Sequence, residues 1–270
     1  MKKCLIIFLA MMMIFTGCNS VDVSSEKESK GDLIFTANGE DFTRKGFTTL
    51  DGWNLKFDNI FISLEDVKAY ICNKPYDAEN NTKIEADEVA VLNKNIIVDL
   101  AAGDENAAPI NLGIVKGVST GIYNAISWKV VNSDDEKMNG SSIVFIGKAE
   151  KDGKIIDFTI RFNKQYEFFG GEFVGENRKG IVEEGKTADV EMTYHFDHIF
   201  GDGSLATDDE LNKGAIGFGP FAKLVVNNEI NVDMDKIKNG FAKDDYEKLL
   251  NLIPTLGHVG EGHCYSVQIK

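Results

Sequence analysis

The chain has only four histidines: His195, His198, His258 and His263. All four fall in the last part of the sequence, where they form two close pairs, one in HFDH and one in HVGEGH. Imidazole is the commonest protein ligand for zinc and is also used for copper, nickel and iron. The two pairs therefore predict a transition-metal site, zinc or copper, provided that the fold brings them together.

The first pair follows a segment with strand periodicity. Val190, Met192, Tyr194 and Phe196 alternate and are expected to face the core, which leaves His195 and Asp197 side by side on the polar face. Asp197 is then a second ligand or a carboxylate that orients the histidine. His198 joins them only if the strand ends near Phe196, and the following Gly201-Asp202-Gly203 favours that ending.

The second pair lies in the glycine-rich segment 257–264, GHVGEGHC, whose flexible backbone is expected to form a loop that wraps a small ion. Its possible ligands are His258, Glu261, His263 and Cys264. Two histidines from each pair would make a closed four-coordinate set suited to zinc. A thiolate from Cys264 would move the preference toward Cu(I).

Other readings of these residues stay open. The histidines can be ordinary surface or hydrogen-bonded residues, and Asp202-Gly203-Ser204 has a partial likeness to a calcium loop. A metal-dependent hydrolase would use Glu261 or Asp197 as its base, although the zinc-hydrolase motif H-E-x-x-H is absent from the sequence. We expect a protein that is not an enzyme.

The N-terminus has the layout of a secretion signal. Met1-Lys2-Lys3 precedes an apolar run at 5–15, which is too short to span a bilayer, and Thr16-Gly17-Cys18 follows. Small residues before a cysteine resemble the lipobox of bacterial lipoproteins. The resemblance implies a signal peptide at 1–17, cleavage before Cys18, and acyl chains such as palmitate on that cysteine. The protein would then be lipid-anchored in the cell membrane or outer membrane, facing the periplasm or the exterior.

Residues 18–31 are polar and rich in Ser, Lys and Glu, so they are expected to form a flexible tether. The chain carries a net charge of −14, and removing the two lysines of the signal takes the mature chain to −16. An acidic chain of this kind argues against nucleic acid as a partner.

Residues 32–270 are expected to form one mainly β domain, an antiparallel β-sandwich with a few short C-terminal helices at about 201–270. The expected strands are Trp53–Leu64, Ile96–Leu100, Gly121–Val131, Ser142–Ala149, Ile155–Phe162, Ala188–Phe196 and Tyr265–Ile269. Asp152-Gly153 predicts a type I′ hairpin. The expected helices run from an N-cap at Thr207 to about Lys213, over Val232–Phe241, and over Asp244–Leu252.

Cleavage and lipidation would leave two cysteines, Cys72 and Cys264. In an oxidising compartment they are candidates for a disulfide, with two free thiols, or Cys264 as a metal ligand, as the alternatives.

The stretch from Asn38 to Val131 runs NGEDF…GW-L-FDNIFISLEDVKAY…IIVDL…GIYNAISWKV. It resembles secreted bacterial sandwich domains, among them the MbnP-like copper-binding proteins of the cell envelope. The resemblance implies a sandwich, an envelope location and copper. Together with the histidines it suggests a lipoprotein that captures or transfers a metal, working with an envelope metal transporter. The alternative is a structural or interaction module of the envelope without metal.

Overall fold

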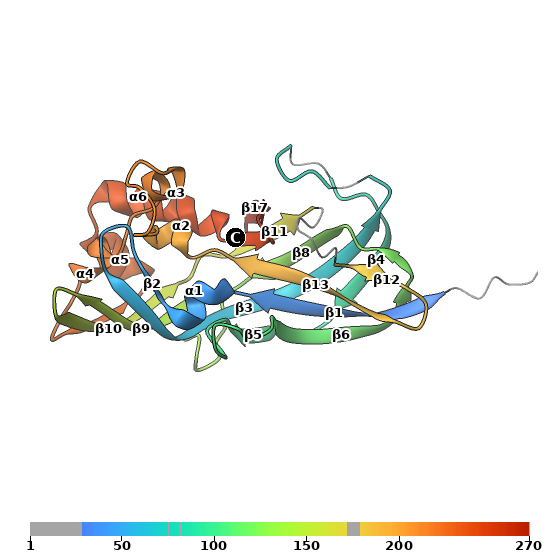
Figure 1. Ribbon diagram of the computed structural model, residues 1–270, viewed down its shortest axis with the longest axis horizontal. Coiled ribbons are helices and arrows are strands. Elements are labelled where there is room, and N and C mark those ends of the chain that lie inside the picture. The colour runs from blue at the N-terminus through green and yellow to red at the C-terminus, as the bar shows by residue number, and fades with distance from the viewer. Residues whose placement is uncertain (1–28, 75, 81–82, 172–178, 270) are drawn as a thin grey trace, which may run out of the picture.

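The computed structural model describes residues 29–74, 76–80, 83–171 and 179–269, and its strands build two large sheets (Figure 1). The strands are β1 (Lys30–Asn38), β2 (Phe47–Thr48), β3 (Asn54–Cys72), β4 (Ala86–Leu92), β5 (Ile96–Asp99), β6 (Ile110–Ser119), β7 (Gly121–Ile122), β8 (Ala125–Val130), β9 (Ile143–Lys151), β10 (Lys154–Phe162), β11 (Tyr166–Gly170), β12 (Ile181–Val182), β13 (Thr187–Tyr194), β14 (Glu229–Val232), β15 (Gly257–Val259), β16 (Gly262–His263) and β17 (Tyr265–Gln268). The first strand begins two residues before the domain start expected at 32.

One sheet has the order β16-β15-β13-β1-β6, and the other has β14-β10-β9-β3-β8-β11-β17, with β2, β4 and β5 also paired to β3. Side chains from both sheets belong to the same buried cluster. Across the interface, the ring centroids of Trp128 and Tyr194 lie 6.3 Å apart, and those of Phe145 and Phe196 lie 5.0 Å apart. The mainly β, sandwich-like architecture expected from the sequence is confirmed.

Two strand pairs depart from the expected antiparallel arrangement. β1 pairs with β13 in parallel, with Asn38 opposite Thr193, and β10 pairs with β14 in parallel. Parallel neighbours need a long connection, and here β1 and β13 are separated by most of the domain. The alternation of apolar residues within a strand does not indicate in which direction a distant partner strand runs. The parallel pairing was therefore not predicted from the sequence.

The expected strands and the hairpin are confirmed in outline. Asp152 and Gly153 have φ values of 51° and 77° and link β9 to β10, with Lys151 opposite Lys154, which is the geometry of a two-residue type I′ turn. The strand expected at Trp53–Leu64 is longer, since β3 continues to Cys72 and pairs with five other strands. The strand expected at Gly121–Val131 is divided into β7 and β8.

The helices are short, and most gather at one end of the sandwich (Figure 1). They are α1 (Glu40–Lys45), α2 (Asp197–Phe200), α3 (Glu210–Gly214), α4 (Gly219–Ala222), α5 (Met234–Gly240), α6 (Lys243–Leu252) and the 3-10 turn η1 (Ile253–Thr255). The cap of α3 is a correction: Asp209 rather than Thr207 is the N-cap, and its carboxylate accepts a hydrogen bond from the Leu211 amide. The N-terminal α1 was not expected, because six residues show no helical period.

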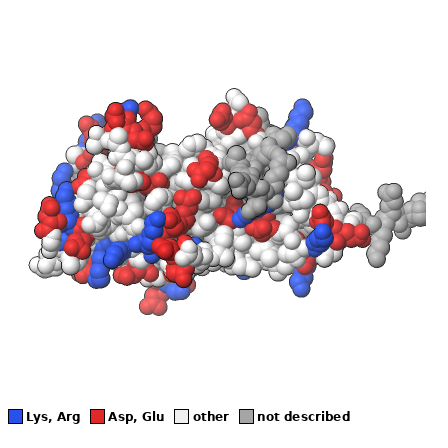
Figure 2. Space-filling model, in the orientation of Figure 1, with Lys and Arg blue, Asp and Glu red and all other residues white. Residues whose placement is uncertain are grey.

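The predicted signal peptide, Cys18 and most of the predicted tether lie outside the described residues. No helix in the described part of the chain is long and apolar enough to cross a membrane. On the face seen in Figure 2, acidic side chains occur at both ends and in the middle, with lysine and arginine side chains scattered between them.

Candidate metal centre

The candidate site lies where three neighbouring strands of the five-stranded sheet meet. Because β1 and β13 run parallel, both end at the same edge, with Asn38 opposite Thr193. β15 pairs antiparallel with the other side of β13 and places His258 opposite Thr193 as well. Residues from three distant parts of the chain therefore meet at the end of β13.

The first histidine pair lies just beyond β13. The strand ends at Tyr194, and the His195 amide donates a hydrogen bond to the Leu256 carbonyl at 3.1 Å, which attaches this point to the segment leading into β15. The chain then turns into α2, which ends at Gly201 in the left-handed region (φ 68°). This turn brings His198 back toward His195, with their ring centroids 5.8 Å apart.

The second pair lies on a tight hairpin rather than on the expected wrapping loop. β15 and β16 are joined by Gly260 and Glu261, with Val259 opposite Gly262 and His258 opposite His263. Gly260 has a φ of 55°, which permits this short connection. The glycines therefore serve the hairpin and do not surround an ion.

Three of the predicted ligands come together. One nitrogen from each of His195, His198 and His258 can be chosen so that all three lie within 4.8 Å of one another. The rings of His195 and His258 stack at 4.1 Å with an interplanar angle of 7°. Zinc–nitrogen bonds of about 2.0–2.1 Å would place ligand nitrogens roughly 3.3 Å apart. The limit of 4.8 Å is wider than this spacing, so a bound ion would draw the three nitrogens closer together.

Thr255 fixes the tautomers of two of these histidines. Its hydroxyl donates to the Leu252 carbonyl at 2.9 Å, so it accepts from Nδ1 of His198, which is also 2.9 Å away. Its carbonyl accepts from Nε2 of His258 at 3.0 Å. Each neutral ring thereby donates its one N–H to Thr255. The other nitrogen, Nε2 of His198 and Nδ1 of His258, then carries a free lone pair. Hydrogen bonds of this kind orient metal-binding histidines.

Two nitrogens of the cluster are buried and have no hydrogen-bond partner in the described part of the chain: Nε2 of His195 and Nδ1 of His258. His195 and His258 as whole residues are 9% and 2% exposed. Leaving such a group without a partner costs about 1–3 kcal/mol, and an ion or a water molecule commonly accounts for it in native proteins. The residues present therefore fit a bound cation.

Burial also keeps two of the imidazoles unprotonated, those of His198 and His258. It lowers the pKa of His198 to about 4 and that of His258 to about 3, with further lowering by the positive charge that His195 and His263 carry when protonated. Both are neutral at pH 7, which is the form that binds metals.

The other predicted ligands lie around this group or outside it. His263 is exposed, with its ring centroid 4.7 Å from that of His258, and it is not one of the three residues whose ligand atoms converge. The partly buried Asp197 has one carboxylate oxygen that accepts no hydrogen bond from the described residues, and burial raises its pKa while the charge of His195 lowers it. Glu261 is exposed on the β15–β16 turn.

The two cysteines play no part in the cluster. Both are free, which is one of the alternatives that the sequence left open beside the candidate disulfide. Cys72 belongs to a small cluster with Tyr76 and Ala125, whereas Cys264 packs against the main core. Burial raises the pKa of the Cys264 thiol far above its ordinary value, so it is not a thiolate, and it is absent from the converging group.

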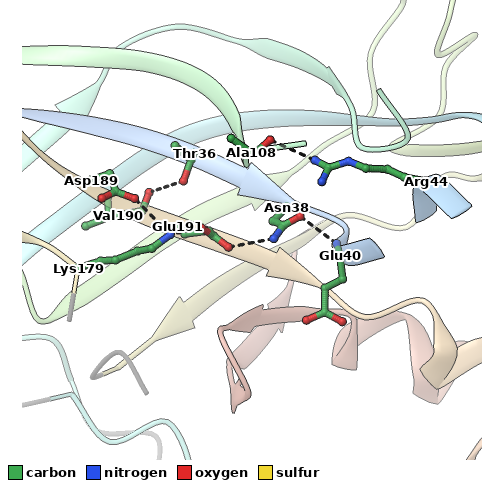
Figure 3. Close-up of polar contacts among 9 residues, drawn as sticks. All are labelled: Thr36, Asn38, Glu40, Arg44, Ala108, Lys179, Asp189, Val190 and Glu191. Atoms are coloured by element: carbon green, nitrogen blue, oxygen red, sulfur yellow. Dashed lines mark hydrogen bonds and ion pairs between the residues drawn. The ribbon is translucent and has the colours of Figure 1, made fainter. Parts of the chain in front are cut away.

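One residue of the site was missed from the sequence. Oε1 of Glu40, from the start of α1, lies 3.4 Å from Nε2 of His195. Burial, followed by the nearby charges of Glu261 and Asp197, raises the pKa of Glu40, while His195 lowers it. No local signal pointed to Glu40, because its place beside His195 depends on the parallel pairing of β1 with β13 (Figure 3).

Two short catalytic patterns do occur in the sequence, and the structure gives both a different role. Gly180–Thr187 has the spacing of a phosphate-binding loop, but it contains β12 and leads into β13, whereas a phosphate loop leads into a helix. Gly117–Gly121 has the spacing of a serine nucleophile motif, but Ser119 ends β6 and is followed by β7, without the required helix.

Comparisons of the chain with protein-family models, with curated proteins and with solved structures found no match.

Proposed function

We propose that this protein is a membrane-anchored, extracytoplasmic lipoprotein that binds a transition metal ion, zinc or copper, through His195, His198 and His258. The observation that carries the metal proposal is the convergence of three imidazole nitrogens within 4.8 Å, with two buried nitrogens of the cluster making no hydrogen bond within the described residues. The fixed tautomers and the low pKa values of His198 and His258 support it further.

Elemental analysis of the full-length protein, purified in detergent, tests this proposal. We expect equimolar zinc or copper, or equimolar uptake on titration of the protein after treatment with a chelator. Replacing His258→Gln should abolish uptake. The matched control is His263→Gln on the facing strand, which should retain it because His263 is outside the converging group. A folded wild-type protein that takes up neither metal would overturn the proposal.

We further propose that the protein captures or hands over its ion, for an envelope metal transporter, and is not an enzyme. A cavity of about 340 Å³ reaches both His198 and the exposed His263, which gives an ion a route between solvent and the buried ligands. The metal-loaded protein is expected to hydrolyse no peptide, ester or phosphoester. Metal-dependent turnover that is lost in His258→Gln would replace this proposal with a hydrolase.

The anchor is proposed from Thr16-Gly17-Cys18 and the apolar run before it. Two or three acyl chains on one cysteine hold a protein durably at a membrane. Mass spectrometry should find a mature N-terminus at Cys18 that carries acyl chains, and Cys18→Ser should move the protein out of the membrane fraction. A mature chain that begins elsewhere without lipid would contradict the anchor and leave the metal proposal untouched.

A further inference from the structure

We infer that Glu40 is the fourth ligand of this centre and that its carboxylate makes the ion a divalent cation rather than Cu(I). The inference rests on the proposed metal function and names the class of ion that the site takes.

The first argument is a distance. Oε1 of Glu40 lies 3.4 Å from Nε2 of His195, and that nitrogen makes no hydrogen bond within the described residues. Neighbouring ligands of a tetrahedral zinc, with bonds of about 2.0–2.2 Å, lie roughly 3.4 Å apart. The two atoms are therefore spaced as two ligands of one ion.

The second argument is charge. The carboxylates of Asp197 and Glu261 each lie close enough to that of Glu40 to repel its negative charge. Within the described part of the chain, neither lysine nor arginine forms an ion pair with any of these three acids, and His195 is the one basic group in contact with Glu40. A divalent cation beside His195 would balance this concentration of negative charge.

The third argument is the unfavourable backbone conformation in which the fold holds Glu40. Its backbone is in the left-handed region (φ 61°), which is unfavourable for a residue with a Cβ. The Asn38 side chain accepts a hydrogen bond from the Glu40 amide at 3.0 Å and donates one to Glu191 on β13 at 3.2 Å. Figure 3 shows the Glu40 side chain leaving this turn away from Asn38.

The rest of α1 is held from its other side. Arg44 donates hydrogen bonds to the carbonyls of Ala102, Ala107 and Ala108, and the Thr43 hydroxyl donates to the Leu100 carbonyl at 2.9 Å. Unfavourable backbone angles that are fixed from both sides are typical of functional positions. A carboxylate oxygen is also a harder ligand than the sulfur ligands that select Cu(I), and the Cys264 thiol is not part of the group.

The test compares Glu40→Gln with Asp41→Asn in the full-length protein in detergent. Gln keeps the shape of Glu and removes its charge, and Asp41 is the adjacent acid, which pairs with Lys45 instead of the histidines. We expect Glu40→Gln to raise the Kd for Zn²⁺ by more than about 100-fold, above the roughly 10–100-fold loss typical of a partner outside the ligand shell. Asp41→Asn should leave the Kd unchanged.

Two further measurements identify the ligands and the ion. X-ray absorption of the zinc-loaded protein should give three imidazoles and one oxygen, with the oxygen retained in Asp41→Asn and lost in Glu40→Gln. In competition between Zn²⁺ and Cu(I), each buffered by a chelator of known affinity, the wild type should load zinc. An equal Kd in Glu40→Gln, or a preference for Cu(I), would overturn the inference while the metal function stood. Failure to bind either ion would instead overturn the proposed function.

Discussion

At the residue scale, Thr255 is as informative as the ligands themselves. Its hydroxyl and its carbonyl accept hydrogen bonds from His198 and His258, so one residue determines which nitrogen each ring can offer to an ion. Only the hydroxyl bond depends on the side chain, and that bond can be removed by substitution.

We predict that Thr255→Val lowers metal affinity by about 10–100-fold, because His198 loses the acceptor that fixes its tautomer. The free energy of unfolding of the metal-free protein should fall by about 1 kcal/mol from the lost hydrogen bonds. Isothermal titration and urea unfolding measure the two effects. Thr207→Val is the matched control at an exposed threonine and should change neither. Unchanged affinity in Thr255→Val would show that the tautomer is set in another way.

The low pKa values of His198 and His258 predict a defined dependence of stability on pH in the metal-free protein. In the unfolded chain both imidazoles take up a proton near the ordinary pKa of 6.5, whereas the folded chain takes up none until about pH 4 and pH 3. The unfolded state therefore binds more protons between these limits. The two histidines must lower the free energy of unfolding as the pH falls from about 6.5 toward about 4.

Glu40 and Asp197 act in the opposite sense, because burial raises their pKa values, so the histidine contribution is isolated by difference. Urea unfolding in the presence of a chelator should show that His258→Gln loses less stability than the wild type between pH 7 and pH 5. Parallel losses in the two proteins would mean that His258 titrates normally in the folded state.

At the element scale, turn conformations determine the register of the strands that form the scaffold. The β9–β10 hairpin depends on Gly153 in the left-handed region (φ 77°), and a Cβ at this position would meet no other atom within 4 Å. A substitution there tests the backbone conformation alone, because the added Cβ would not clash with any neighbouring residue.

We predict that Gly153→Ala lowers the free energy of unfolding by about 1 kcal/mol, which is the cost of a left-handed residue with a Cβ. Metal affinity should stay the same, since the hairpin contributes no ligand. Gly214→Ala in α3 is the matched control: a Cβ there also meets nothing within 4 Å, φ is not in the left-handed region, and alanine favours the helix. It should raise stability or leave it unchanged, as measured by urea unfolding.

At the scale of the whole molecule, the ligands are distributed over elements that share one core. His195 follows β13, His198 is in α2 and His258 is in β15, and the aromatic residues beside them belong to the same buried cluster as both sheets. An ion bound here would connect separate parts of the chain in the folded state only.

We therefore predict that metal binding raises the Tm of the entire domain in one transition. At a free ion concentration of 100 times the Kd, binding adds about 2.7 kcal/mol. For a domain of this size that corresponds to a rise in Tm of roughly 5–10 °C. Differential scanning calorimetry with and without a chelator measures the shift. His263→Gln should keep the shift and His258→Gln should lose it, and a shift confined to a separate early transition would contradict the shared core.

Several features of the protein followed from the sequence alone, because they depend on neighbours along the chain. Alternating apolar residues gave the mainly β class, Asp152-Gly153 gave the hairpin, and the apolar stripe and Pro254 gave the helix α6. The clustering of the histidines gave four candidate ligands, and three of them converge. Each of these patterns extends over only a few residues, and the backbone geometry of those residues determines the structure that they form.

Tertiary structure alone decided which residues surround those histidines. Glu40 lies beside His195 because β1 and β13 run parallel across an interval of about 150 residues, and no local pattern specifies that direction or register. Thr255 became a partner of two histidines only through the turn between α6 and β15. His263 and Cys264 were predicted ligands but are not among the converging residues, for a related reason. The glycine-rich segment pairs as a hairpin, and this pairing fixes where each side chain lies. The sequence determined the donor types, and long-range strand pairing selected the donors that share one site.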